Sequence, residues 1–269
     1  MKILLSKDKV IKFTNREKNL GFVPTMGTIH KGHISLIKKS ISECKKTIVT
    51  IYVNKPQFDK SHDYVKYPRN IKRDINLLKK LKIDFLYLPK TKEIYPRGQN
   101  KKINIDPFEK KLCGKYRPGH FKAIVDVVER FIKIIKPKKI FFGEKDKQQL
   151  KIIENFVYKN YRNVKIVPCK TIREKNGIAL SSRNLLLSSN EKIIASKVFK
   201  ILKNNKLKLI KKIIDIKFIK KEIKKLGVKK IDYVELININ KIIKPFKRKL
   251  RKKIFIAYYL GKTRLIDNF

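Results

Sequence analysis

With 269 residues the chain is long enough for a sizeable hydrophobic core in two lobes, and no apolar run approaches the roughly 18 residues of a membrane helix. Its 70 Lys and Arg against 22 Asp and Glu give a formal net charge of +48, which would suit a nucleic-acid-binding protein, and the basic run at 244–253 could follow a phosphate backbone. Yet the basic residues are spread through every segment and accompany many isoleucines and asparagines, which indicates a bias toward A/T-rich codons and argues against a dedicated nucleic-acid function.

Alternating strands and helices are predicted along the first part of the chain. Short apolar runs bounded by turns are typical of buried parallel strands, and apolar residues at helical spacing, such as Phe121, Ile124 and Val128, are typical of helices. Strands are predicted at 20–23, 48–53, 85–88, 140–142 and 164–167, and helices at 71–81 and 121–135. This alternation predicts an α/β fold with a doubly wound, Rossmann-like parallel sheet, whose ligands bind at the carboxyl ends of the strands.

The pattern changes after Asn184. A lysine-rich helical stretch is followed by strand-like segments at 231–237, 254–260 and 263–266, which predict a smaller C-terminal α+β domain. The linker is expected near residues 173–180. We therefore expect a Rossmann-like domain over residues 1–176 and a small α+β domain over residues 177–269.

The most informative motif is His30-Lys31-Gly32-His33, which follows the predicted strand at 20–23 and opens an amphipathic helix. The free N–H groups and the positive dipole end at a helix start suit a polyphosphate. Two imidazoles can donate to phosphate oxygens as charge grows on them during attack at the α-phosphorus, and Gly27 and Gly32 let the main chain approach a ligand closely. On its own, however, the motif would also fit a loop with two solvated histidines.

Three further segments carry polar groups in predicted loops. The segment 117–121 places His120 in a glycine-containing turn. The segment 141–149 follows the strand-like residues 139–140 and offers a lysine for phosphate, with carboxylates and amides for hydroxyl groups. The segment 181–184 offers two hydroxyls and a guanidinium, a suitable clamp for the outer phosphates of a nucleotide. Each segment alone could equally be a helix cap or a solvated charge cluster.

Together and in this order, the motifs resemble the pantothenate synthetase (pantoate–β-alanine ligase) family of the H-x-G-H nucleotidyltransferase superfamily. The resemblance implies ATP-dependent condensation of (R)-pantoate with β-alanine to pantothenate through a pantoyl adenylate, with release of pyrophosphate and AMP. It implies a homodimer that binds ATP, pantoate and β-alanine as its substrates. Mg²⁺ would enter with ATP, and no tightly bound organic cofactor is expected. It covers nearly the whole chain, through the segments 23–33, 53–58, 67–69, 117–121, 143–150, 181–184, 232–235 and 263–267.

The resemblance also implies roles for individual residues, with the C-terminal domain as a lid. His33 is expected to be the proton donor, and the residues expected in catalysis are His30, His33, Lys145, Ser181, Ser182 and Arg183. Contacts to pantoate and β-alanine are expected from Asn54, Gln57, His120 and Gln149. Contacts to ATP are expected from Met26, Gly27, Thr28, Ile29, His30, Lys31, Gly32, His33, Gly143, Glu144, Lys145, Asp146, Ile172, Leu180, Ser181, Ser182 and Arg183.

The chain departs from the family pattern at two places. The family usually has N-P-x-Q-F, whereas residues 54–58 read N-K-P-Q-F, so the loop that carries Gln57 is expected to follow a slightly different path. The family also tends to show adjacent acidic residues after the Y-P-R element, but here Arg73 precedes Asp74. Asp74 is therefore a weak candidate for a magnesium ligand, because Mg²⁺ would be bound mainly by the phosphates of ATP.

Two other classes of protein remain open from the sequence. A different H-x-G-H enzyme would transfer AMP or CMP and stop there, although Gln57, Gln149 and His120 favour a pantoate pocket. A basic nucleic-acid-binding protein would leave the ordered polar motifs unexplained. Three cysteines without regular spacing and an N-terminus without a signal-peptide pattern predict the cytoplasm.

Overall fold

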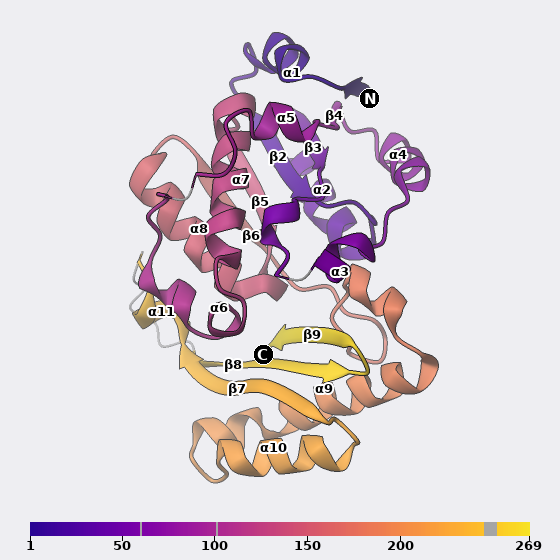
Figure 1. Ribbon diagram of the computed structural model, residues 1–269, viewed down its shortest axis with the longest axis vertical. Coiled ribbons are helices and arrows are strands. Elements are labelled where there is room, and N and C mark those ends of the chain that lie inside the picture. Colours follow the sequence, from indigo (N-terminus) through magenta and orange to yellow (C-terminus); the bar gives the residue numbers. More distant parts are fainter. Residues whose placement is uncertain (60, 101, 245–251) are drawn as a thin grey trace.

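A six-stranded parallel sheet forms the larger lobe of the computed structural model, which describes residues 1–59, 61–100, 102–244 and 252–269 (Figure 1). The strand order is β1-β4-β3-β2-β5-β6, so the direction of winding reverses between β2 and β5. Doubly wound sheets bind ligands at this reversal, beyond the carboxyl ends of the strands. The strands are β1 (Lys2–Leu4), β2 (Leu20–Thr25), β3 (Lys46–Ile51), β4 (Phe85–Tyr87), β5 (Lys139–Gly143) and β6 (Lys165–Cys169).

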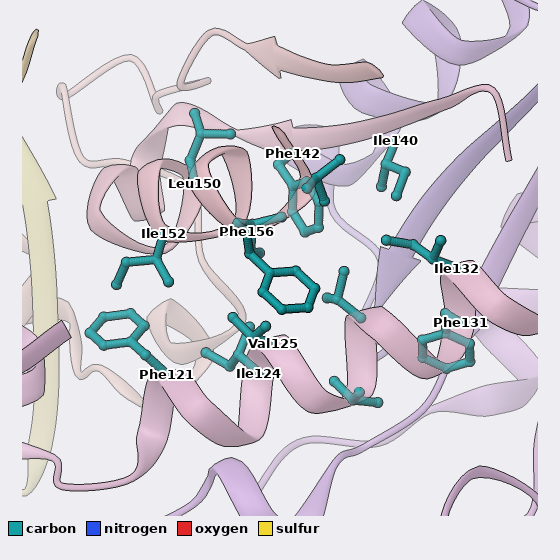
Figure 2. Close-up of a cluster of buried hydrophobic side chains, with 14 of the residues drawn as sticks. Phe121, Ile124, Val125, Phe131, Ile132, Ile140, Phe142, Leu150, Ile152 and Phe156 are labelled. Atoms are coloured by element: carbon teal, nitrogen blue, oxygen red, sulfur yellow. The ribbon is translucent and has the colours of Figure 1, made fainter. Parts of the chain in front are cut away.

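Helices cover both faces of this sheet. Successive side chains of a strand point to opposite faces, so Phe22 packs into one hydrophobic layer and Val23 into the other. Burial on both sides explains why the strands read as continuous apolar runs. Figure 2 shows the first layer, where Phe142 packs among side chains from two helices. That layer contains α1 (Lys7–Thr14), α7 (His120–Ile135) and α8 (Lys147–Asn160), and the other contains α2 (Lys31–Glu43) and α4 (Ile71–Lys80).

The C-terminal lobe has a separate antiparallel sheet of three strands, in the order β7-β8-β9. Its own core joins the sheet to two lysine-rich helices through Val198, Leu202, Ile219 and Ile256. The predicted α/β fold with a smaller α+β lobe is therefore confirmed. The elements are α9 (Ser189–Ile210), α10 (Ile216–Lys225), β7 (Lys230–Asn238), α11 (Ile239–Ile242), β8 (Lys252–Leu260) and β9 (Thr263–Asn268). Residues 245–251 of the basic run at 244–253 lie outside the described residues.

Short helices lie in the connections between these elements. They are η1 (Lys55–Gln57), α3 (Ser61–Val65), α5 (Thr91–Ile94), η2 (Pro107–Lys110), α6 (Cys113–Tyr116), η3 (Glu144–Asp146) and η4 (Ser182–Leu186), where η denotes a 3₁₀ helix. Within the described segments, no helix combines the length and the apolar character that a bilayer crossing demands.

The predicted linker near residues 173–180 is a tight hairpin. Arg173 and Ala179 form an antiparallel bridge, and Gly177 closes the turn at φ +91°. A Cβ at Gly177 would also collide with the ring of Phe199, so both the backbone and the available space require glycine. The division of the chain into residues 1–176 and 177–269 stays a prediction.

Candidate active site

A cavity of about 240 Å³ lies at the carboxyl ends of β2 and β5. We call it the main cavity. Three of the predicted motifs reach its wall: His30 and His33 after β2, Lys145 and Asp146 after β5, and the segment 181–183. These motifs are distant in the sequence, and the sheet topology brings them together at the point where the winding reverses.

The turn between β2 and α2 is held by a buried carboxylate. Gly27 and Thr28 both adopt positive φ, +83° and +53°, and a threonine rarely adopts this conformation. Asp74 is 1% exposed, and its two carboxylate oxygens accept hydrogen bonds from the main-chain N–H groups of Thr28 and Ile29 at 2.7 and 2.8 Å. The Thr28 hydroxyl donates to the Pro68 carbonyl at 2.7 Å. These bonds fix the backbone that leads into the histidine motif.

This geometry gives Asp74 a structural role. It does not line the main cavity, and both of its oxygens already bind the turn. Among the described residues, no group of three or more His, Cys, Asp or Glu side chains has the arrangement of a metal site. The magnesium role of Asp74 stays a prediction that this arrangement does not support.

The two histidines stack on each other, with ring centroids 4.0 Å apart. His30 caps α2, because its Nδ1 accepts from the Gly32 N–H at 3.1 Å, which leaves Nε2 to carry the proton in the neutral ring. Burial, aided by the Lys145 cation, lowers the pKa of His30 to about 4. Burial, followed by His30 and Lys145, lowers the pKa of His33 to about 3. Without a ligand, both rings are neutral at pH 7 and act as single N–H donors.

Lys145 is the cation that faces these rings. It lies in η3, the short turn between β5 and α8, with its ammonium 3.5 Å from the Asp146 carboxylate. Ser182, which also lines this cavity, shares a 3.1 Å hydrogen bond with the Tyr67 hydroxyl, and Arg183 follows it in η4. The wall therefore combines ammonium, guanidinium and hydroxyl groups, which suits the outer phosphates of a nucleotide.

A second cavity of about 120 Å³, which we call the side cavity, adjoins the main cavity. Gln57, Lys145, Gln149 and Arg183 line both cavities. The Gln57 side chain is restrained by Asn54, because the Asn54 Nδ2 donates a hydrogen bond to the Gln57 Oε1 at 3.2 Å. The two predicted glutamines thus lie at the border between the cavities.

Asn54 and His120 support the loop that carries Gln57. Asn54 is 1% exposed, and its oxygen accepts from the Tyr95 hydroxyl at 2.8 Å. His120 donates from Nδ1 to the Gln57 carbonyl at 2.8 Å and accepts at Nε2 from Arg117, also at 2.8 Å. Burial, reinforced by Arg117, lowers the pKa of His120 well below 6.5 and keeps the ring neutral. Direct contact of either residue with a substrate stays a prediction.

The displaced proline of the 54–58 segment falls inside η1. Pro56 occupies the first turn of this short helix, where its missing N–H leaves no donor unsatisfied. Arg117 closes the loop from outside, since it pairs with Asp59 at 2.7 Å and donates to the Gln57 carbonyl at 3.1 Å. Whether the loop path differs from that of relatives stays a prediction.

The sequence model for pantoate-beta-alanine ligase matches residues 3–269 of this chain. The chain belongs to the pantoate–β-alanine ligase family. The pantothenate synthetase of Caldicellulosiruptor saccharolyticus is 39% identical over 99% of this chain and 96% of its own length. The pantothenate synthetase of Francisella tularensis subsp. novicida is 39% identical over 94% of this chain and 90% of its own length.

Solved structures of pantoate–β-alanine ligases share the fold. The Francisella tularensis ligase, complexed with β-γ ATP and β-alanine, superposes with a TM-score of 0.87 at 38% identity, covering 100% of this chain and 97% of that one. The pantothenate synthetase of Thermus thermophilus gives a TM-score of 0.89 at 29% identity, with coverage of 100% and 99%. The structural likeness therefore extends over both lobes.

Some residues that the family resemblance assigns to ATP binding do not line either cavity. Thr28 and Ile29 bind Asp74 through their main chain, and Glu144 pairs with Lys147 at 2.7 Å. Among the described residues that were expected to contact ATP, those that line neither cavity are Gly27, Thr28, Ile29, Lys31 and Glu144. Contact of these residues with ATP stays a prediction.

Other wall residues were not predicted from the sequence. Lys170 and Thr171 follow β6 and line the main cavity beside Ile172, but they belong to no motif. In the sequence, only their position after a predicted strand indicated that they could line the site. Tyr67 was noted in the Y-P-R element without a role, and it reaches the wall through its bond to Ser182.

Proposed function

We propose that this member of the pantoate–β-alanine ligase family condenses pantoate with β-alanine in an ATP-dependent reaction that passes through pantoyl adenylate. The observation that carries the proposal is the convergence of His30, His33, Lys145 and Arg183 on one cavity, with Gln57 and Gln149 at its border with a second. The main cavity suits a nucleotide and the border suits a hydroxy acid, because amides can both donate to and accept from its polar groups.

In the first step, a pantoate carboxylate oxygen attacks the α-phosphorus and pyrophosphate leaves with the bonding electrons. Negative charge grows on the phosphate oxygens, and donors already oriented toward them stabilise this charge most. His30 and His33 supply N–H groups, and Lys145 and Arg183 supply positive charge. A bound triphosphate would raise the pKa of both histidines, which supports His33 as a proton donor in this step.

In the second step, the neutral β-alanine amine attacks the acyl carbon, the acyl–oxygen bond breaks with its electrons leaving on AMP, and the nitrogen releases a proton as the amide forms. The side cavity opens onto the border where Gln57 and Gln149 lie, so an amine held there would face a pantoyl group held by these amides. Asn54 and His120 would act through the loop that they fix.

We propose that Mg²⁺ enters with ATP as part of the substrate. Among the described residues that line the main cavity, Asp146 is the only acidic one. A wall with one carboxylate fits a Mg²⁺ ion that is bound mainly through phosphates and water.

We propose the C-terminal lobe as a lid, because Leu180, Ser181, Ser182 and Arg183, which lead into its first helix, line the main cavity together with residues of the larger lobe. This would let the closed site exclude water from the reaction. The homodimer and the cytoplasmic location stay predictions from the sequence.

The test is isotope exchange without the amine. With MgATP and pantoate but no β-alanine, the protein should exchange labelled pyrophosphate into ATP, and the exchange should stop when pantoate is omitted. Added β-alanine should then give pantothenate and AMP. Exchange without pantoate would instead indicate a nucleotidyl-enzyme, and formation of ADP and phosphate would indicate an acyl-phosphate ligase; either result would overturn the proposed mechanism.

A further inference from the structure

The turn that carries Lys145 is held by a side chain from the end of the chain. Asn268, in β9, is 4% exposed, and its Nδ2 donates to the main-chain carbonyls of Glu144 and Lys145 at 2.9 and 2.8 Å. Its Oδ1 accepts from the Lys253 ammonium at 2.8 Å. One buried amide group therefore donates two hydrogen bonds to the main chain of η3. The two acceptors, in Glu144 and Lys145, are 124 and 123 residues away from Asn268 in the sequence.

The strand that presents this amide is itself firmly placed. In Figure 1, β9 is the strand of the small sheet nearest the larger lobe. Asp267 pairs with both terminal nitrogens of Arg173 at 2.6 and 2.9 Å, and this guanidinium lies over the rings of Phe199 and Phe269. Planar, bidentate pairing fixes orientation as well as distance. Asn268 thus extends from a rigid support toward η3.

The turn is short, and apart from Asn268 the Glu144–Lys147 ion pair, at 2.7 Å, ties it to α8. It is a single 3₁₀ turn of three residues, and Asp146, which precedes α8, makes no side-chain cap. The carbonyl of Lys145 belongs to the residue whose ammonium faces the main cavity, so a change in the turn would move the cation itself. A displacement of about 1 Å in a preorganised site can cost about 10²-fold in rate.

The geometry points to Asn268 as a positioning residue for Lys145, through which the C-terminal lobe sets the place of the catalytic cation. This role rests on the proposed function, because it assumes that Lys145 acts on the phosphates of ATP. Asn268 lines neither cavity, so it acts only through the turn. The two lobes are then coupled by the main chain of the catalytic loop as well as by the walls of the cavity.

A double-mutant cycle tests this role by pantoate-dependent pyrophosphate exchange. Asn268→Asp keeps the shape and removes both N–H donors, so we expect kcat to fall about 10- to 10²-fold, with the KM for pantoate changed less than about threefold. In the Lys145→Ala background the same change should cost less than about threefold, because no ammonium remains to be misplaced. An undiminished loss in that background, or no loss in the wild-type background, would overturn the role.

Two further variants control for folding. Asn155→Asp makes the same change at a residue that is 2% exposed and donates to the Lys244 carbonyl, away from both cavities, and it should retain wild-type exchange. Asn268→Ala, which removes the donors without adding charge, repeats the cycle if Asn268→Asp does not fold. The wild-type protein alone tests the proposed function, since its lack of pantoate-dependent exchange would refute that function before any variant is compared.

Discussion

Replacing Asp74 should destabilise the protein before it affects any metal. The carboxylate is 1% exposed and accepts two main-chain hydrogen bonds, at 2.7 and 2.8 Å. A hydrogen bond to a charged group contributes about 1.5–3 kcal/mol, so Asp74→Ala should lower the free energy of unfolding by about 3–6 kcal/mol. Asp74→Asn keeps one acceptor and turns an NH₂ group toward one donor, so its loss should be smaller, about 2–4 kcal/mol.

The assay is urea unfolding without ATP or Mg²⁺, so that only the protein's own contacts contribute. Typical domains have about 5–15 kcal/mol of total stability, which makes the expected loss easy to measure. Asp63→Ala serves as the matched control, since the Asp63 side chain is 51% exposed, and it should change the stability by less than about 0.5 kcal/mol. If Asp74→Ala unfolds like the control but needs more Mg²⁺ for activity, Asp74 is a metal ligand and the structural assignment is wrong.

Three other results are expected. His33→Ala and Lys145→Ala should each lower the rate of pyrophosphate exchange by about 10²–10³-fold while the fold persists, since each removes one oriented donor; near-wild-type turnover in a folded variant would show that the wrong residue is assigned. Gln57→Ala and Gln149→Ala should weaken pantoate binding by about 1–3 kcal/mol and ATP binding much less in calorimetry, and equal weakening would indicate a structural role. Burial lowers the pKa of His33 from 6.5 to about 3, so the unfolded chain takes up this proton first and stability falls as pH drops below 6.5 toward 3. Between pH 7 and pH 5, His33→Gln should therefore lose about 2 kcal/mol less stability in urea unfolding than the wild-type protein, and equal losses would show that the folded state already carries the proton on His33.

Sequence patterns were sufficient where the structure is local and periodic. The apolar runs around Phe22, Ile48 and Phe141 predicted buried strands, and each strand was found with ends shifted by only a few residues. The short strand Lys2–Leu4 and the helix Lys7–Thr14 were not predicted. A strand of three residues at the sheet edge has too little apolar pattern to be recognised, and that helix has mostly polar positions.

The site was predictable as a set of motifs but not as a set of contacts. The predicted strand ends and glycine turns indicated that His33, Lys145 and Gln149 would lie near one site, and all three line the main cavity. The turns that the side chains of Asp74 and Asn268 hold are 45 or more residues away in the sequence, and no spacing rule connects such pairs. Local chemistry therefore indicated which polar groups gather at the cavity, whereas the tertiary fold determines which groups hold them.

The Tyr67–Ser182 hydrogen bond, 3.1 Å long, joins a loop of the larger lobe to the segment that leads into the C-terminal lobe. A pantoyl adenylate is a mixed anhydride, and in open solvent it would be consumed by hydrolysis. With the C-terminal lobe as the proposed lid, each rupture of this bond would admit water, which competes with β-alanine for the acyl carbon. If the reaction passes through the proposed adenylate, the yield of pantothenate per ATP depends on how long the two hydroxyls stay together, and the Tyr67→Phe protein should consume ATP without making an equivalent amount of amide.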